Sequence, residues 1–180
     1  MPVPKIHPEN ENKIHFLTFT TIEWIDIFTK PPYFQLLLNS MEYCRNNLGL
    51  MVYGYVFMTN HIHVIWQAKI GYQLSQIVLS YKRFTTEKIE ALIKEDNRKH
   101  IAGLIGTSFF KKPGNRFQVW RDYNYPEVIE TDIFLQEKLN YIHNNPAKKR
   151  YVEKPENWLY SSAKFYVSGD CSLFMIDKIK

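Results

Sequence analysis

The stretch LMVYGYVFMTNHIHVIWQ, residues 50–67, predicts the centre of the fold. Residues 50–58 and 61–67 are rich in β-branched and aromatic side chains, which favour extended strands. Thr59 and Asn60 lie between these two runs and are typical of a tight turn. We therefore expect two antiparallel strands joined by a short turn.

The segments around this pair of strands extend the pattern. Residues 14–20 are expected to form an earlier strand, and Pro31 is expected to open a helix that closes before Gly49. After the paired strands, apolar residues repeat every three or four positions from Leu74 to Leu92, which predicts a long helix.

The second half of the chain adds a strand and a further helix. Residues 101–117 contain glycines, a proline and several basic residues, and are expected to form a loop or a basic hairpin. A strand is expected over 117–120 and again near 128–129. Thr131 or Asp132 is expected to cap a last helix, which Pro146 stops.

This order of elements predicts the fold class. Strand, helix, strand, strand, helix, strand and helix make an α+β, ferredoxin-like or RRM-like split βαβ fold with an antiparallel sheet and one additional C-terminal helix. Residues 1–166 are expected to form one domain, and residues 167–180 a short, loosely attached C-terminal extension.

Length and composition exclude several classes of protein. The 180 residues are 45% hydrophobic and 16% aromatic, which excludes a disordered or collagen-like chain. Cys44 and Cys171 fit no metal or redox spacing, so two free thiols in a reducing compartment are expected. A polar, proline-broken start and the lack of a long apolar run predict no signal peptide and no membrane contact. We expect a cytoplasmic protein.

The positive charge is concentrated in two segments. The chain has 23 lysines and arginines against 18 acidic residues, a formal charge of +5. Residues 111–125 and 148–154 each hold four basic residues and one acidic residue, so together they account for more than the net charge. Aromatic residues lie among them, and this mixture suits single-stranded nucleic acid. A solvated basic surface over core aromatics is the alternative. The candidate DNA contacts are Lys111, Lys112, Arg116, Arg121, Lys148, Lys149 and Arg150, with Lys82 and Arg83 on the long helix.

A histidine pair, His61 and His63, is the sharper signal. Alternate residues of a strand point to one face, so the two imidazoles project together while Ile62, Val64 and Trp66 enter the core. Such a pair can bind one divalent ion, although a purely structural or surface pair is the alternative. No Asp-x-His and no Pro-Cys-x-x-Cys accompanies the pair, so any further ligand must come from elsewhere in the chain.

The last helix carries a candidate nucleophile. Tyr141 lies off the apolar stripe of that helix, and Lys138 and Asn145 share its side. A tyrosine hydroxyl can attack a phosphodiester when a metal polarises the phosphate, and the Asn145 amide can complete the metal's ligands. Because Asn145 precedes Pro146, we expect it to leave helical geometry. The alternative is that Tyr141 only packs at the boundary of the core and has no chemical role.

Ordered motifs resemble those of a known family. GYVFMTNHIH (54–63) resembles the histidine-hydrophobic-histidine (HUH) strand of single-tyrosine transposases, and YIHNNP (141–146) resembles their catalytic tyrosine motif. WLYSSA (158–163) is similar to their C-terminal signature, and FQVW (117–120) also matches. The resemblance covers roughly residues 14–166, and the branch in question is the REP-associated tyrosine transposases.

The resemblance implies a metal-dependent DNA strand transferase with a ferredoxin-like fold. His61 and His63 would be metal ligands with Asn145 as the third, and the cofactor would be Mg²⁺ or Mn²⁺. Tyr141 would attack single-stranded, hairpin-flanked DNA, leaving a 5′-phosphotyrosine and a free 3′-hydroxyl.

Alternatives remain open at this point. The runner-up is a non-catalytic module of the same fold that binds single-stranded DNA or RNA and acts as a domesticated regulator. Thr59 stands where relatives usually have proline, and residues 148–150 replace a stretch of small residues and glycine. A homodimer is also open, because some relatives exchange the tyrosine helix between two chains and others work as monomers.

Overall fold

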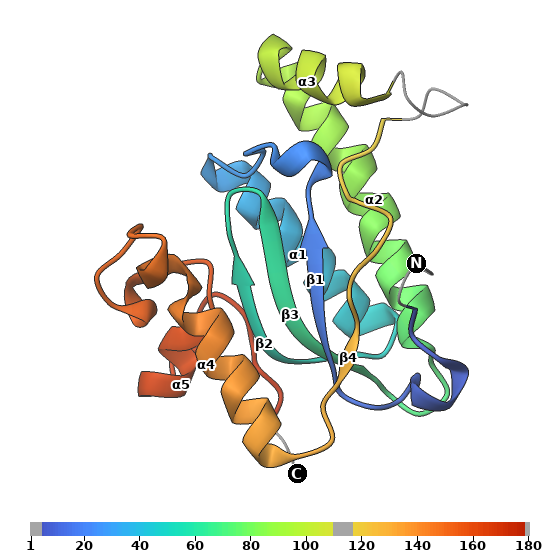
Figure 1. Cartoon of the computed structure of the whole chain (residues 1–180), viewed down its shortest axis with the longest axis vertical. Coiled ribbons are helices and arrows are strands. Elements are labelled where there is room, and N and C mark those ends of the chain that lie inside the picture. The colour runs from blue at the N-terminus through green and yellow to red at the C-terminus, as the bar shows by residue number, and fades with distance from the viewer. Residues whose placement is uncertain (1–4, 110–116, 179–180) are drawn as a thin grey trace.

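The sheet stands at the centre of the structure, a computed structural model that describes residues 5–109 and 117–178 (Figure 1). Its strands are β1 (His15–Thr20), β2 (Leu50–Phe57), β3 (His61–Ala68) and β4 (Glu127–Val128). They lie in the order β2-β3-β1-β4, and each neighbouring pair is antiparallel. Since β1 and β2 both run antiparallel to β3, they are parallel to each other, as a split βαβ unit requires. The predicted α+β, ferredoxin-like fold is confirmed.

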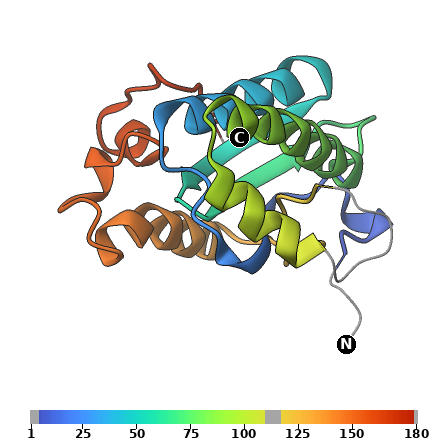
Figure 2. The ribbon, with the colours of Figure 1, turned by 90° about the horizontal axis from the view of Figure 1, so that it is seen from above.

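Helices cover both faces of this sheet (Figure 2). α1 (Pro31–Asn47) and α2 (Leu74–Glu95) pack on one face, and α4 (Asp132–Lys148) packs on the other. Short 3-10 turns lie in the connecting segments: η1 (Pro8–Asn10), η2 (Ile22–Trp24) and η3 (Pro155–Asn157). Among residues 5–109 and 117–178, no helix combines the length and the apolar character that crossing a membrane requires.

The side chains of β3 alternate between two apolar cores. Ile62, Val64 and Trp66 lie in the core beneath α1 and α2, whereas Ile65 lies in the core beneath α4. Because successive side chains of a strand point to opposite faces, His61 and His63 share the α4 face with Ile65. The predicted division of this strand into a core face and a histidine face is confirmed.

Gly54 allows α4 to lie close to the sheet. The pairing of β2 with β3 shifts between Val52 and Gly54, which marks a bulge. A Cβ atom at Gly54 would lie 2.7 Å from Cδ2 of Leu139 and 3.2 Å from Cδ1 of Ile142, both on α4. A side chain at position 54 would therefore force Leu139 and Ile142 to shift within the packed core.

The prediction of a loop or basic hairpin over residues 101–117 is wrong for residues 101–109. Residues Lys99–Phe109 form α3, and Ile105 is fully buried in the core beneath α1 and α2, with Ile101 packed against it. The helix contains two glycines, Gly103 and Gly106, each of which costs about 1 kcal/mol inside a helix. Burial of Ile105, at about 1.5–3 kcal/mol, together with the packing of Ile101 offsets this cost. Only an isolated bridge between Thr21 and Trp120 forms where a strand was expected over 117–120.

The end of α4 also differs from the expectation. Pro146 lies inside the helix, which continues to Lys148, and Asn145 keeps its helical position. The missing N–H of Pro146 removes one backbone hydrogen bond, and only two helical residues follow it. The N–H of Lys149 donates to the carbonyl of Asn145 at 3.0 Å and closes the helix.

The C-terminal segment is attached to the domain rather than loose. α5 (Ala163–Ser168) was not predicted, and the expected domain boundary at residue 166 falls inside it. Phe174 and Ile176 are buried in the core beneath α1 and α2. The N–H of Asp177 donates to the Val52 carbonyl at 2.8 Å, and its carboxylate accepts from the Val52 N–H at 2.7 Å. The tail thus pairs with the outer edge of β2.

Candidate active site

The two histidines of β3 form a buried pair facing α4. Their ring centroids are 4.9 Å apart, and His61 and His63 are only 8% and 5% exposed. The two-residue repeat of the strand brings the rings together, and the helix covers them. This is the juxtaposition that the sequence pattern predicted.

Each imidazole is oriented through its Nδ1 atom. Nδ1 of His61 lies 2.8 Å from Oδ1 of Asn60, and Nδ1 of His63 lies 2.8 Å from Oγ1 of Thr18. An amide oxygen can only accept, so Nδ1 of His61 carries the proton and the lone pair stays on Nε2. A hydroxyl can hold His63 in the same form. Both rings thereby keep Nε2 free as a ligand atom, which is how metal-binding histidines are arranged.

Burial keeps both histidines neutral. It lowers the pKa of His61 to about 4, and the positive charge of Lys149 acts in the same direction. It lowers the pKa of His63 to about 3, with further lowering by His61 and Lys138. A histidine must be deprotonated to bind a metal, so at neutral pH the pair is in the form that ligation needs.

Tyr141 lies beside this pair. Its ring centroid is 5.3 Å from that of His63, and it meets the Phe16 ring edge-on at 6.0 Å. The side chain is 45% exposed, so a substrate can reach its hydroxyl. Nζ of Lys148 lies 5.8 Å from the Tyr141 ring centroid and adds a positive charge next to the phenol.

Asn145 lies one turn beyond Tyr141 on α4 and is buried. Tyr141, one turn before it, contacts His63, and Lys149, one turn after it, is close enough to lower the pKa of His61. Asn145 therefore lies on α4 between the residue that contacts His63 and the residue whose charge acts on His61. Within the described part of the chain, its side-chain amide makes no hydrogen bond.

The donor atoms near the histidine pair determine which metal the site can hold. Residues 5–109 and 117–178 contain no cluster of three or more histidine, cysteine, aspartate or glutamate side chains. The available donors are therefore two neutral imidazoles and the amide oxygen of Asn145. Amide and phosphate oxygens are ligands that Mg²⁺ and Mn²⁺ prefer, whereas imidazole nitrogens are more typical of other first-row transition metals.

Positive charge flanks the pair on two sides. Lys148, Lys149 and Arg150 are exposed at the end of α4. The Arg121 guanidinium lies 5.3 Å from the ring centroid of Trp24, and that ring meets His61 at 5.7 Å.

The remaining predicted DNA contacts are placed differently. Nζ of Lys82 donates to the Arg121 carbonyl at 2.5 Å and to Oδ1 of Asn124 at 2.8 Å. Burial lowers its pKa to about 8. Lys82 thus holds the 121–124 segment, and its ammonium is already used within the protein. Arg83 is exposed on α2, across the sheet from the histidines. Lys111, Lys112 and Arg116 lie outside the described residues.

The WLYSSA segment anchors α4 to the sheet. The Phe57 N–H donates to the Tyr160 carbonyl at 2.9 Å, and the Ser162 N–H donates to the Tyr55 carbonyl at 3.0 Å. Oγ of Ser162 accepts from the Tyr55 N–H at 2.9 Å and lies 2.8 Å from Nε2 of His143 on α4. One serine hydroxyl therefore ties the tyrosine helix to β2.

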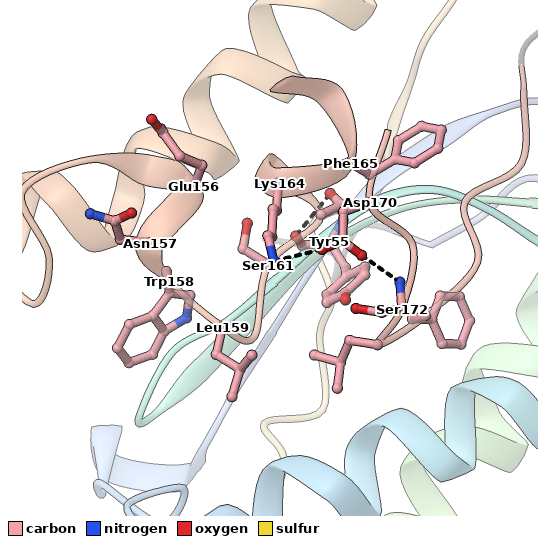
Figure 3. Close-up of a pocket in the computed structure, with 13 residues that line it drawn as sticks. Tyr55, Glu156, Asn157, Trp158, Leu159, Ser161, Lys164, Phe165, Asp170 and Ser172 are labelled. Atoms are coloured by element: carbon pink, nitrogen blue, oxygen red, sulfur yellow. Dashed lines mark hydrogen bonds and ion pairs between the residues drawn. The ribbon is translucent and has the colours of Figure 1, made fainter. Parts of the chain in front are cut away.

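A pocket of about 440 Å³ lies behind this segment, apart from the histidine pair (Figure 3). Two of its three charged groups are paired with each other: Nζ of Lys164 lies 2.5 Å from Oδ2 of Asp170, and Oδ1 of Asp170 accepts from the Ser172 N–H at 2.8 Å. None of His61, His63, Tyr141 and Asn145 lines it.

Sequence reasoning missed three residues of the site. Thr18 is opposite His63 in the sheet register, and only a correct strand pairing would have revealed it. Asn60 immediately precedes His61 and was assigned only to the turn. Trp24 lies in a segment to which no element was assigned.

Comparison with solved structures supports this fold. No protein-family model matches the sequence, and no curated protein matches it. A REP-associated tyrosine transposase bound to a REP hairpin matches with a TM-score of 0.64 and 17% identity, covering 94% of this chain and 87% of that chain. A candidate transposase from Deinococcus radiodurans R1 matches with a TM-score of 0.48 and 13% identity, covering 80% of this chain and 97% of that chain. The chain therefore shares, over nearly its whole length, the fold of a REP-associated tyrosine transposase.

Proposed function

We propose that the chain is a single-tyrosine HUH transposase that cuts and rejoins single-stranded, hairpin-flanked DNA. The observation that carries this proposal is the contact between Tyr141 and His63, at 5.3 Å between ring centroids, beside the buried pair. The fold that it shares with a transposase adds support. Three of the four matching motifs meet at one place. β2 and β3 carry the motif at 54–63, α4 carries the motif at 141–146, and the segment at 158–163 pairs with β2.

The proposed reaction is a transesterification. The phenol oxygen of Tyr141 attacks a backbone phosphorus and loses its proton, and the bond from that phosphorus to the 3′ oxygen breaks. The 3′ oxygen takes up a proton and leaves as a free hydroxyl, and the DNA remains linked through a 5′-phosphotyrosine. Attack of a 3′-hydroxyl on this linkage reverses the step and rejoins a strand.

The residues around Tyr141 have defined parts in this scheme. A divalent ion held by His61, His63 and Asn145 would withdraw charge from the phosphate under attack. Lys148 places a positive charge 5.8 Å from the Tyr141 ring centroid, where it would attract the phosphate that the tyrosine attacks. Lys149 and Arg150 lie where the flanking phosphates would pass.

The proposed substrate class rests on the charges around the histidine pair. The matching transposase was solved with a REP hairpin bound, and this chain has basic groups on two sides of the histidine pair. We propose that the DNA partner is a single strand that crosses the histidine pair and carries a hairpin beside it. Since Tyr141 contacts His63 of its own chain, one chain provides the complete set of groups.

A covalent adduct is the direct test. The protein is incubated with Mn²⁺ and a pool of labelled single strands that carry randomised hairpins, and the products are separated under denaturing conditions. Wild type is expected to yield a labelled protein band, and Tyr141→Phe none. Tyr151→Phe is the matched control, because Tyr151 is similarly exposed near the same basic segment. An equal adduct in Tyr141→Phe contradicts the nucleophile. DNA binding without any adduct in wild type favours the non-catalytic module instead.

The metal is tested in the same assay. The double variant His61→Ala/His63→Ala is expected to lose the adduct and to keep most of its DNA affinity, since phosphate contacts by lysine and arginine supply most of that affinity. Equal loss of binding and cleavage would show that the pair is structural.

A further inference from the structure

The segment before α1 holds an exposed tryptophan in a strained turn. Glu23 and Trp24 both have left-handed backbone angles, with φ of +50° and +56°. Neither is a glycine, so this conformation costs free energy that the surrounding structure must offset. Its effect is to leave the indole of Trp24 51% exposed instead of packing it in the core.

Hydrogen bonds fix this turn to the histidine pair. The Trp24 N–H donates to the Thr21 carbonyl at 3.2 Å, and the side chain of Asn60 donates to the Trp24 carbonyl at 3.2 Å. The same Asn60 accepts from Nδ1 of His61 at 2.8 Å. One asparagine thus sets both the imidazole of His61 and the backbone of Trp24, whose ring meets that imidazole at 5.7 Å.

Trp24 is also one wall of a pocket of about 440 Å³ between η2 and α3. Ile101 and Leu104 of α3 line it with apolar surface, and Glu23 and Asp26 add carboxylates. An aromatic wall with apolar surface opposite favours a flat, hydrophobic ring. The carboxylates repel phosphate but accept hydrogen bonds from ring N–H and amine groups of bases.

The charge beside the pocket has the opposite sign. The Arg121 guanidinium lies 5.3 Å from the Trp24 ring centroid, outside the set of pocket-lining residues. Its backbone N–H is fixed to the Thr20 carbonyl at 2.8 Å, and Lys82 holds its carbonyl. An arginine in this position can bind the phosphate that follows a base seated on the indole.

We propose that Trp24, with the pocket behind it, is a binding subsite for one unpaired nucleobase next to the phosphate at the histidine pair, and that Arg121 binds the adjoining phosphate. This inference rests on the proposed function, because it takes the strand crossing the pair to be DNA. Stacking of one base would fix the register of the strand, so that a single phosphodiester faces Tyr141.

Binding without cleavage tests the subsite. The Tyr141→Phe protein is titrated in EDTA with two labelled probes of roughly 20 nucleotides, a single strand of mixed sequence and an all-abasic strand of equal length and charge. Adding Trp24→Ala is expected to weaken binding of the mixed-sequence strand about tenfold and of the abasic strand less than twofold. Tyr43→Ala, which removes an exposed aromatic from α1 across the sheet, is the matched control and should change neither.

Tryptophan fluorescence gives a second readout. Base stacking quenches indole emission, so the mixed-sequence strand should quench the parent protein and the abasic strand should not. Trp24→Phe keeps an aromatic surface and is expected to bind within about threefold of the parent while losing most of the quenching. Equal losses on both probes, no loss on either, or full quenching in Trp24→Phe overturns the subsite.

The two proposals fail in different ways. If the mixed-sequence probe shows the Trp24 effect but wild type forms no adduct with Mn²⁺, the strand-transfer function is wrong and the base subsite stands. If the adduct forms but Trp24→Ala binds both probes like its parent, the subsite is wrong and the function stands. Failure of the parent protein to bind any single strand overturns both.

Discussion

The Thr18 hydroxyl lies 2.8 Å from Nδ1 of His63, and the two residues face each other across β1 and β3. The neighbouring strand therefore sets the orientation of this imidazole. Through this contact, the sheet fixes the His63 ring whose centroid lies 5.3 Å from that of Tyr141.

Loss of the Thr18 hydroxyl should weaken the metal site. Thr18→Val keeps the shape of the side chain but removes its hydrogen bond to His63. Partners of this kind typically change metal affinity or activity 10- to 100-fold, and we expect a loss in about that range. Titration of adduct formation with Mn²⁺ measures it. Thr20→Val is the control, since Thr20 faces His61 on the same strand. Equal behaviour of the two variants would contradict the role of Thr18.

Mixing two inactive variants should not restore adduct formation. Tyr141 and His63 meet within one chain, so a Tyr141→Phe chain and a His61→Ala/His63→Ala chain each lack part of their own site. We expect no adduct above background when the two are mixed in equal amounts. Recovery of a substantial fraction of wild-type adduct would show instead that a homodimer shares its active sites.

Gly54→Ala should displace the tyrosine helix. The added Cβ atom would lie 2.7 Å from Leu139, and overpacking of this kind costs about 1–3 kcal/mol. We expect a lower free energy of unfolding and, because α4 carries Tyr141, a loss of adduct formation at temperatures where the protein is folded. Gly103→Ala in α3 is the control, because its Cβ meets no atom within 4 Å. Gly54→Ala with wild-type stability and activity would refute the close packing.

Substitutions of the adjacent residues Lys82 and Arg83 should affect different properties, stability for Lys82 and DNA binding for Arg83. As a predicted phosphate contact, Arg83 should count in binding, so Arg83→Gln is expected to lower the salt dependence of DNA binding by about one phosphate contact. Lys82→Gln should mainly lower stability, because it leaves the Arg121 carbonyl without its donor. Salt titrations of binding and urea unfolding separate the two effects. A salt effect confined to Lys82→Gln would overturn this assignment.

Stability should fall on mild acidification. Burial lowers the pKa of His143 to about 4, so between this value and the ordinary value of 6.5 only the unfolded chain takes up the proton. The contribution of neutral His143 to the free energy of unfolding is complete above pH 6.5 and declines toward pH 4. The decline amounts to roughly 2 kcal/mol between about pH 7.5 and about pH 5. Urea unfolding at both values, compared with His143→Gln, measures this. The variant should lose less stability on acidification than wild type. The same loss in both would contradict the prediction.

Local patterns in the sequence were sufficient for the framework of this protein. The alternation at 61–66 determines which side chains enter the core, and Thr131 caps α4 as predicted, accepting from the Phe134 N–H at 3.2 Å. Strand and helix periods depend on residues close together in the chain, so they can be predicted without knowledge of the fold. The order of these elements was then enough to predict the split βαβ sheet.

Only the tertiary structure decided the details on which the site depends. The helical stretch at 99–109 depends on burial of Ile105, and the attachment of the tail depends on pairing with β2. Thr18 meets His63 through strand register, and Trp24 is turned outward by hydrogen bonds to a segment far along the chain. Each of these features arises from contacts between residues distant in sequence, whose energies outweigh local preference, so no local pattern encodes them.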